Sequence, residues 1–120
     1  MIEAAVNPKH AAGRAKVSLR HIPPSVLAAE GRVADGGAAK YGPFNWRGGV
    51  TASVYYDAAL RHLLAWYTGE DIDPESGETP LAHVRCCMAI LMDAQTMGVL
   101  EDDRPAGHTT TFNPKHGATK

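Results

Sequence analysis

Cysteine is scarce in this chain, and two residues among 120 cannot build a disulfide framework or a zinc site of several thiolates. Cys86 and Cys87 are adjacent, and neighbouring helical residues point in different directions, so we expect no bond between them. Buried, reduced thiols fit better and are usual in a reducing cytoplasm. Long apolar runs are missing too: none approaches the roughly 20 residues that span a bilayer, and no signal peptide is recognisable. We therefore expect a soluble, cytoplasmic protein.

A large net charge is also missing. Twelve basic and thirteen acidic residues give a formal charge of −1, which argues against nucleic acid or a membrane as partner. The chain has no Gly-rich phosphate loop ending in Lys-Ser/Thr, no His-Glu-x-x-His, no Gly-x-Ser-x-Gly and no His-Asp dipeptide. The cysteines lie in an apolar helical run, where a thiol is a poor nucleophile. The usual signatures of several hydrolase classes are thus absent.

The length fits a single domain, 1–120, with a core over about 15–100. Helices are predicted over about 25–39, 51–68 and 79–97 from apolar periodicity and from their Pro, Thr and Gly boundaries. Residues 1–23 are expected to form an extended or partly mobile arm with a short strand at 17–19. Residues 101–120 are expected to form a tail that is ordered only if a partner chain holds it. The predicted fold is all-α: a compact bundle of three to four helices, with oligomerisation supplementing a small core.

The stretch between the last two predicted helices is strongly acidic and contains no Lys or Arg. A histidine lies on each side of it, His62 and His83. Carboxylates this close repel one another unless water or a cation screens them. The stretch is therefore either a solvated surface loop or a site for a hard cation and its phosphate ligand. Its carboxylates are Glu70, Asp71, Asp73, Glu75 and Glu78.

The segment 40–49 is rich in aromatic side chains and bracketed by Gly-Pro and Gly-Gly. Its aromatics either pin a loop to the core or line a pocket. In the second case Lys40 and Arg47 can bind phosphate, Asn45 can read a base edge, and Trp46 can stack on the base. In the following helix Asp57 and Arg61 are spaced i,i+4, so they lie on one face of the helix with His62 beside them. They form either a surface ion pair or a partly buried polar seam.

Several ordered segments resemble the phage and prophage domain named for dATP/dGTP diphosphohydrolases, which is similar to the all-α MazG-like NTP pyrophosphatases. The resemblance covers about residues 15–95. It is carried by Leu19…Ile22-Pro23-Pro24, Gly37-Ala-Ala-Lys40-Tyr41-Gly42-Pro43-x-Asn45-Trp46-Arg47-x-Gly49, Asp57-Ala-Ala-Leu-Arg61-His62-Leu-Leu-Ala, Gly69-Glu70-Asp71-x-Asp73-Pro74-Glu75-Ser76-Gly77 and Leu81-Ala82-His83.

The resemblance implies a MazG-like dimer or tetramer that uses Mg²⁺ or Mn²⁺ to cut a purine dNTP (dGTP or dATP) into dNMP and pyrophosphate, in phage nucleotide metabolism in the host cytoplasm. It implies metal ligation by Glu70, Asp71 and Asp73. Catalytic roles fall to His62, His83 and Asp57. Substrate binding falls to Lys40, Tyr41, Asn45, Trp46, Arg47 and Arg61.

The chain departs from the MazG-like pattern at two places. The helix over 25–39 has only Glu30 and Asp35 in place of Glu-Glu-x-x-Glu, and Pro80 stands where a further histidine is expected. An alternative is therefore a phage protein that binds or sequesters a nucleotide or cyclic nucleotide without hydrolysing it. A helical scaffold subunit without any ligand is the third possibility.

Overall fold

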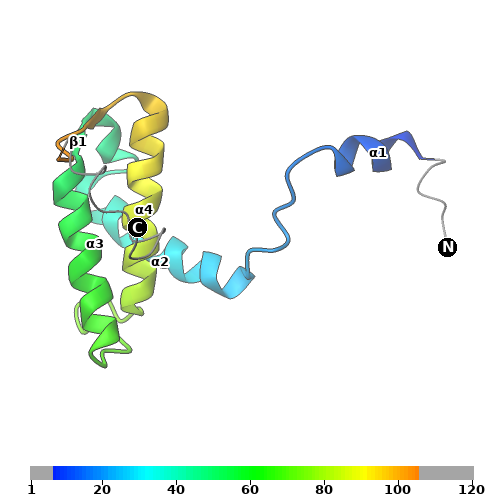
Figure 1. Cartoon of the computed structure of the whole chain (residues 1–120). Coiled ribbons are helices and arrows are strands. Elements are labelled where there is room, and N and C mark those ends of the chain that lie inside the picture. Colours follow the sequence, from blue (N-terminus) through cyan, green and yellow to red (C-terminus); the bar gives the residue numbers. More distant parts are fainter. Residues whose placement is uncertain (1–6, 106–120) are drawn as a thin grey trace, which may run out of the picture.

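The computed structural model describes residues 7–105, and most of them are helical. Three helices, α2 (Pro24–Tyr41), α3 (Ala52–Tyr67) and α4 (Pro80–Met97), form a compact bundle. A fourth, α1 (Pro8–Arg14), lies at the end of an arm that runs away from the bundle (Figure 1). The all-α bundle predicted from the sequence is confirmed. None of the helices within 7–105 combines the length and the apolar character that crossing a membrane requires.

The ends of α4 follow from two side chains and one glycine. The Thr79 hydroxyl accepts a hydrogen bond from the Leu81 amide at 3.2 Å, and Pro80 occupies the first turn, where its missing N–H costs nothing. Gly98 adopts φ 70°, a left-handed conformation that stops the helix. The predicted start and end of this helix are confirmed.

The core lies where α4 meets its two neighbours, because α4 packs against both α2 and α3. Its buried apolar side chains are small, which lets the helix axes approach closely. They are Ala52, Ala59, Ala82, Cys87 and Ala94. The sequence prediction of a central helix, small or apolar nearly all round, is thereby confirmed for α4.

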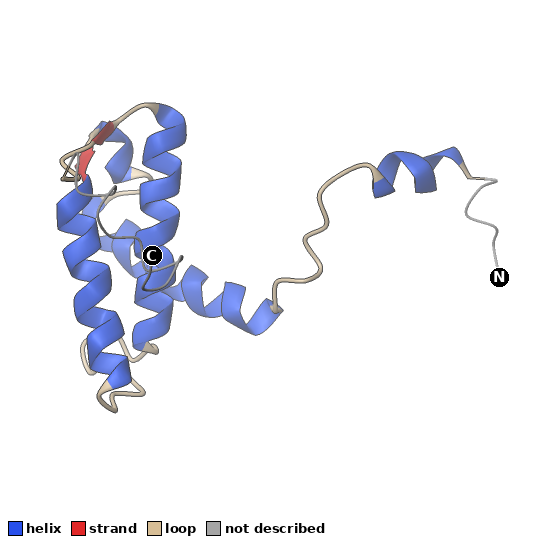
Figure 2. Cartoon of the chain, in the orientation of Figure 1, coloured by secondary structure: helices blue, strands red, loops and turns tan. Residues whose placement is uncertain are grey.

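Two short strands tie the ends of α3 and α4 together (Figure 2). Strands β1 (Val50–Thr51) and β2 (Leu100–Glu101) run parallel, and Val50 pairs with Leu100. The chain then reaches the first turn of α3, where the Ser53 amide donates to Asp103 at 2.9 Å and the Ser53 hydroxyl also donates to that carboxylate. The first residues of the predicted tail are thus held by the chain itself; residues 106–120 lie outside the described part.

The arm differs from its prediction in two respects. The short strand expected at 17–19 is absent from the described residues, and this stretch forms no regular element. The helix α1 was not expected; Asn7 caps it by accepting a hydrogen bond from the Lys9 amide at 2.9 Å, and Pro8 fills its first turn.

Candidate functional site

The loop between α3 and α4 is folded around one carboxylate, that of Asp73. Its Oδ1 accepts hydrogen bonds from the Glu75 and Ser76 amides at 2.7 and 3.3 Å. The backbone of Asp73 is held too, since its amide donates to the Glu78 carbonyl and its carbonyl accepts from Gly77, each at 2.8 Å. Asp and Asn favour such local turns because their short side chains reach the next backbone amides. Asp73 is buried, at 9 % exposure, and its second oxygen, Oδ2, makes no hydrogen bond within residues 7–105.

Two histidines face this carboxylate, one from each flanking helix. His62 of α3 places Nδ1 at 3.8 Å from Asp73 Oδ2, and His83 of α4 places Nε2 at 3.7 Å from the same oxygen. The imidazole rings stack on each other, with centroids 4.3 Å apart and planes 13° from parallel. One imidazole nitrogen from each histidine and one carboxylate oxygen of Asp73, the atoms that could bind a metal ion, all lie within 4.8 Å of one another. We call His62, Asp73 and His83 the His–Asp–His cluster.

The environment of the cluster shifts two of its pKa values. Burial lowers the pKa of His62, and the adjacent His83 lowers it further, which outweighs the opposite effect of Asp73 and Glu70. Burial alone would raise the pKa of Asp73, but the two backbone hydrogen bonds and the two histidines together lower it. The carboxylate is therefore ionised at neutral pH, and the His62 imidazole is neutral.

Ser76 is a member of the site that the sequence reasoning missed. Its hydroxyl lies 2.7 Å from His83 Nε2 and also accepts a hydrogen bond from the Glu78 amide at 3.2 Å. The hydroxyl thus fixes the His83 ring from the loop side. The Asp-Pro-Glu-Ser-Gly sequence could have indicated it, because a serine three residues after a turn-forming Asp lies within the same turn.

The structure brings only one of the three predicted metal ligands to the histidines. Asp73 joins them, Glu70 lies close enough to His62 to affect its pKa, and Asp71 is exposed. The metal-ligand prediction for Glu70 and Asp71 stays a prediction. The predicted catalytic residue Asp57 is also exposed, and within 7–105 it makes no ion pair with Arg61.

The predicted substrate-binding segment is fastened to α4 through Asp93, a residue that the sequence reasoning did not single out. Trp46 Nε1 donates to Asp93 Oδ2 at 2.7 Å, and Arg47 makes two hydrogen bonds to the same carboxylate at 2.9 and 3.0 Å. The Arg47 guanidinium also lies 4.7 Å from the centre of the Phe44 ring. These contacts favour the interpretation of a loop pinned to the core for Trp46 and Arg47. Lys40 and Tyr41, at the end of α2, are exposed.

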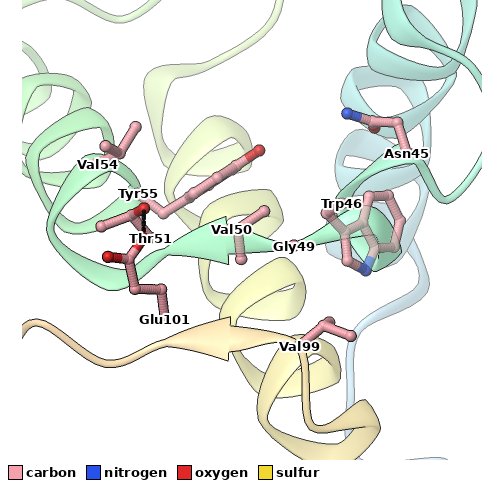
Figure 3. Close-up of a pocket in the computed structure, with 9 residues that line it drawn as sticks. All are labelled: Asn45, Trp46, Gly49, Val50, Thr51, Val54, Tyr55, Val99 and Glu101. Atoms are coloured by element: carbon pink, nitrogen blue, oxygen red, sulfur yellow. Dashed lines mark hydrogen bonds between the residues drawn. The ribbon is translucent and has the colours of Figure 1, made fainter.

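A pocket of about 380 Å³ opens beside this segment, at the end of the bundle where β1 and β2 meet (Figure 3). The indole of Trp46 and the amide of Asn45 line one side, and Tyr55 of α3 the other. Burial raises the pKa of Tyr55, so its hydroxyl keeps its proton. The size and the mixture of aromatic and amide groups suit a planar heterocycle.

The donor atoms of the His–Asp–His cluster decide which metal ions it can accept. Mg²⁺ requires oxygen ligands, and the cluster offers one carboxylate beside two imidazoles. Mn²⁺ and the later divalent ions accept both kinds of ligand. Because the rings are nearly parallel, they would have to rotate before both lone pairs could point at one ion. The residues therefore fit an ion of the Mn²⁺ type better than Mg²⁺.

Comparison with known proteins identifies one family. The family described as dATP/dGTP diphosphohydrolase, N-terminal, matches residues 6–104, which include the whole bundle and the cluster. Neither the curated proteins nor the solved structures gave a significant match.

Proposed function

The chain belongs to the dATP/dGTP diphosphohydrolase N-terminal family, and from this premise we propose that it hydrolyses a purine deoxynucleoside triphosphate to the monophosphate and pyrophosphate with the help of a divalent metal ion. The observation that carries the proposal is the convergence of His62, Asp73 and His83 from two helices and a loop. We propose Mn²⁺ as the preferred ion, with Mg²⁺ as the weaker one, and nucleotide metabolism in the cytoplasm of a phage-infected or prophage-carrying cell as the setting.

In the proposed reaction a water oxygen bonds to the α-phosphorus while the bond from this phosphorus to the bridging oxygen of the β-phosphate breaks. A divalent ion held by Asp73 and His83 would supply positive charge for the phosphate oxygens and lower the pKa of the attacking water. His62 is neutral at physiological pH and, when it does not bind the ion, its lone pair can accept the proton that the water loses. In the metal-free chain the Ser76 hydroxyl orients the His83 ring through Nε2, and an ion bound at this nitrogen would replace the hydroxyl. Pyrophosphate leaves as the second product.

The remaining charge and the base are assigned to residues around the cluster. Arg61 precedes His62 on α3 and, with Lys40, can neutralise the triphosphate. We assign the purine to the pocket beside Asn45 and Trp46. Tyr55 of that pocket and His62 are seven residues apart on α3, two helical turns or about 10 Å along the axis. This separation is of the order that an extended nucleoside triphosphate covers.

The activity is tested by incubating the protein with each dNTP and either Mn²⁺ or Mg²⁺ and separating the products by chromatography. We expect dNMP and pyrophosphate from dGTP or dATP. Asp73→Asn and His62→Gln should each lower turnover by about 100-fold, because each removes a charge or a proton acceptor at the reacting centre. Glu75→Gln, in the same loop but with an exposed side chain, is the matched control. No turnover of any dNTP would contradict the proposal.

Metal binding is measured separately by calorimetry, which does not depend on turnover. We expect Mn²⁺ to bind more tightly than Mg²⁺, and Asp73→Asn or His83→Gln to weaken it by about tenfold or more. Asp71→Asn discriminates between the two ligand sets: a comparable loss would favour the acidic loop, and a small effect would favour the His–Asp–His cluster. Tighter binding of Mg²⁺ would contradict the assignment of the ion to the cluster.

The base assignment is tested by filling the pocket. Val54 lines it, so Val54→Trp should raise the KM for the preferred dNTP while kcat changes little. Met92→Trp adds the same side chain at an exposed position of α4 outside the pocket and is the control. An unchanged KM for Val54→Trp would remove the base from this pocket.

A second function, nucleotide binding without hydrolysis, is supported by the state of Glu30. This is one of only two acids on α2, and its carboxylate accepts a hydrogen bond from Arg85 at 2.9 Å. A carboxylate neutralised in this way is less available to a metal ion. Calorimetric binding of a nucleotide that is recovered unchanged after denaturation of the protein would select this function over the enzyme.

A further inference from the structure

The arm, residues 7–23, is basic and exposes apolar side chains. It contains four Lys or Arg residues and no Asp or Glu. Its extended part also carries Val17 and Leu19 at 85 % and 72 % exposure, values expected of polar residues rather than of Val and Leu. The basic residues are Lys9, Arg14, Lys16 and Arg20. Nothing in the described chain covers the two apolar side chains, since the arm runs away from its own bundle (Figure 1).

The rest of the described chain has the opposite charge. Residues 24–105 contain six basic and twelve acidic residues, a net charge of −6 against +4 for the arm. The outer side of α3 is also apolar. Four exposed residues lie on one side of this helix, because Leu63, Leu64 and Tyr67 follow Tyr56 by seven, eight and eleven positions, or about two to three turns. We call them the α3 ridge. It ends at the acidic loop that begins with Glu70 and Asp71.

We propose that the arm of one chain lies along the α3 ridge of a second copy, so that two chains exchange arms. Val17 and Leu19 pack on the ridge, and the basic residues of the arm face the acidic loop at its end. The α3 ridge contains no member of the His–Asp–His cluster, although the loop at its end does, and the inference does not rest on the proposed function.

The dimensions of the two partners agree. The nine residues 15–23 span up to about 30 Å when extended, and the sixteen-residue helix α3 is about 24 Å long. The Pro23–Pro24 pair restricts the backbone where the arm joins α2, which holds the arm in an outward direction. An outward arm cannot fold back on its own bundle without a change at this joint, whereas a second copy can meet it without one.

A nucleic acid is the other partner that a basic arm suggests. Phosphates would match the four basic residues, but they would leave Val17 and Leu19 in water. A second copy satisfies both the charges and the apolar side chains. The geometry therefore favours the copy.

The test uses the full chain and measures its mass by light scattering over a range of concentrations. We expect a dimer that Val17→Ser with Leu19→Ser weakens by about 100-fold or more, because each of these two side chains contributes a factor of about ten when it is buried. The control is Ala11→Ser with Ala15→Ser, which changes two exposed residues of the same arm. Circular dichroism checks that the bundle is unaffected in both variants.

A cross-link tests the contact itself. A Leu19→Cys chain mixed with a Leu64→Cys chain should form a disulfide-linked pair that neither gives alone, while Met92→Cys in place of Leu64→Cys should not. A monomer at every concentration would overturn the proposal, as would a dimer insensitive to the arm substitutions. Binding of a labelled single-stranded oligonucleotide to the arm without a change of mass would assign the arm to nucleic acid and also overturn it.

Discussion

At the scale of single residues, the pKa values of His62 and Asp73 are both lowered, which leaves the imidazole neutral and the carboxylate charged. Burial favours the neutral form of each group. For His62 it prevails, and the pKa is lowered from 6.5. For Asp73 the amides of Glu75 and Ser76 stabilise the charged form and lower its pKa from 3.8. The folded chain therefore holds a neutral base beside a fixed negative charge, which is a suitable starting state for proton transfer from water.

These shifts predict how stability depends on pH. Between the lowered pKa of folded His62 and 6.5 the unfolded chain binds more protons, so the free energy of unfolding falls as the pH drops below about 6.5. The stabilisation by Asp73 is present above pH 3.8 and is lost as the pH falls through its folded pKa. Thermal melts from pH 7.5 to 3 should show both losses. His62→Gln should flatten the first and leave the second, and an unchanged first slope in this variant would contradict the prediction.

The sequence indicated part of this site and missed the rest for physical reasons. His62 and His83 could be predicted as neighbours because they flank one loop between adjacent helices. The choice of Asp73 over Asp71 as their partner could not, because it depends on a turn that buries one carboxylate and exposes the other. Asp93 could not be found either: its partners Trp46 and Arg47 are 47 and 46 residues away in the chain.

At the scale of elements, the start of α4 and the loop before it are held by the same two residues, Glu78 and Thr79. Thr79 caps α4, and the acidic loop ends directly before it at Glu78, whose carboxylate is hydrogen-bonded to Arg32 of α2 at 2.8 Å. The Glu78 carbonyl also accepts a hydrogen bond from the Asp73 amide. The position of His83 in the first turn of α4 thus depends on the same residues that shape the loop.

Loss of the cap should therefore cost stability at this boundary. Thr79→Ala removes the acceptor of the Leu81 amide and should lower the free energy of unfolding by about 1 kcal/mol, a decrease in Tm of about 4–8 °C for a domain of this size. The comparison is Thr96→Ala, which removes a hydroxyl that, among the described residues, bonds only to the Met92 carbonyl within α4. Chemical denaturation of both variants provides the measurement. Equal losses in the free energy of unfolding would show that the cap stabilises the fold no more than an ordinary side-chain hydrogen bond within the helix.

Elements with long apolar periodicity were predictable, and elements with little local signal were not. The three bundle helices carry this periodicity and the Pro, Thr and Gly signals at their ends. The strands β1 and β2 have two residues each and pair across about fifty positions, so their existence depends on the packing of α3 against α4. The seven-residue helix α1 is too short for a periodic pattern to be recognised.

At the scale of the whole molecule, the near-zero net charge conceals a separation of charge along the chain. The arm carries +4 and residues 24–105 carry −6, although the total is −1. A composition-level argument sees only the total and excludes strong electrostatic partners. The arrangement in space adds a possibility that the total charge does not indicate, because a basic arm held away from an acidic body is available to another acidic body.

Salt should therefore weaken the proposed arm exchange. The screening length falls from more than 10 Å to a few Å between about 0.05 and 0.5 M NaCl, so attraction between the arm and the acidic loop decreases, while burial of Val17 and Leu19 is hardly affected. The dimer dissociation constant, measured by sedimentation over this range, should rise several-fold. In a chain with Lys16→Gln and Arg20→Gln the constant should already be raised at low salt and should change less with NaCl. A constant independent of NaCl in the unaltered chain would mean that charge contributes nothing to the contact, leaving the apolar side chains to hold it alone.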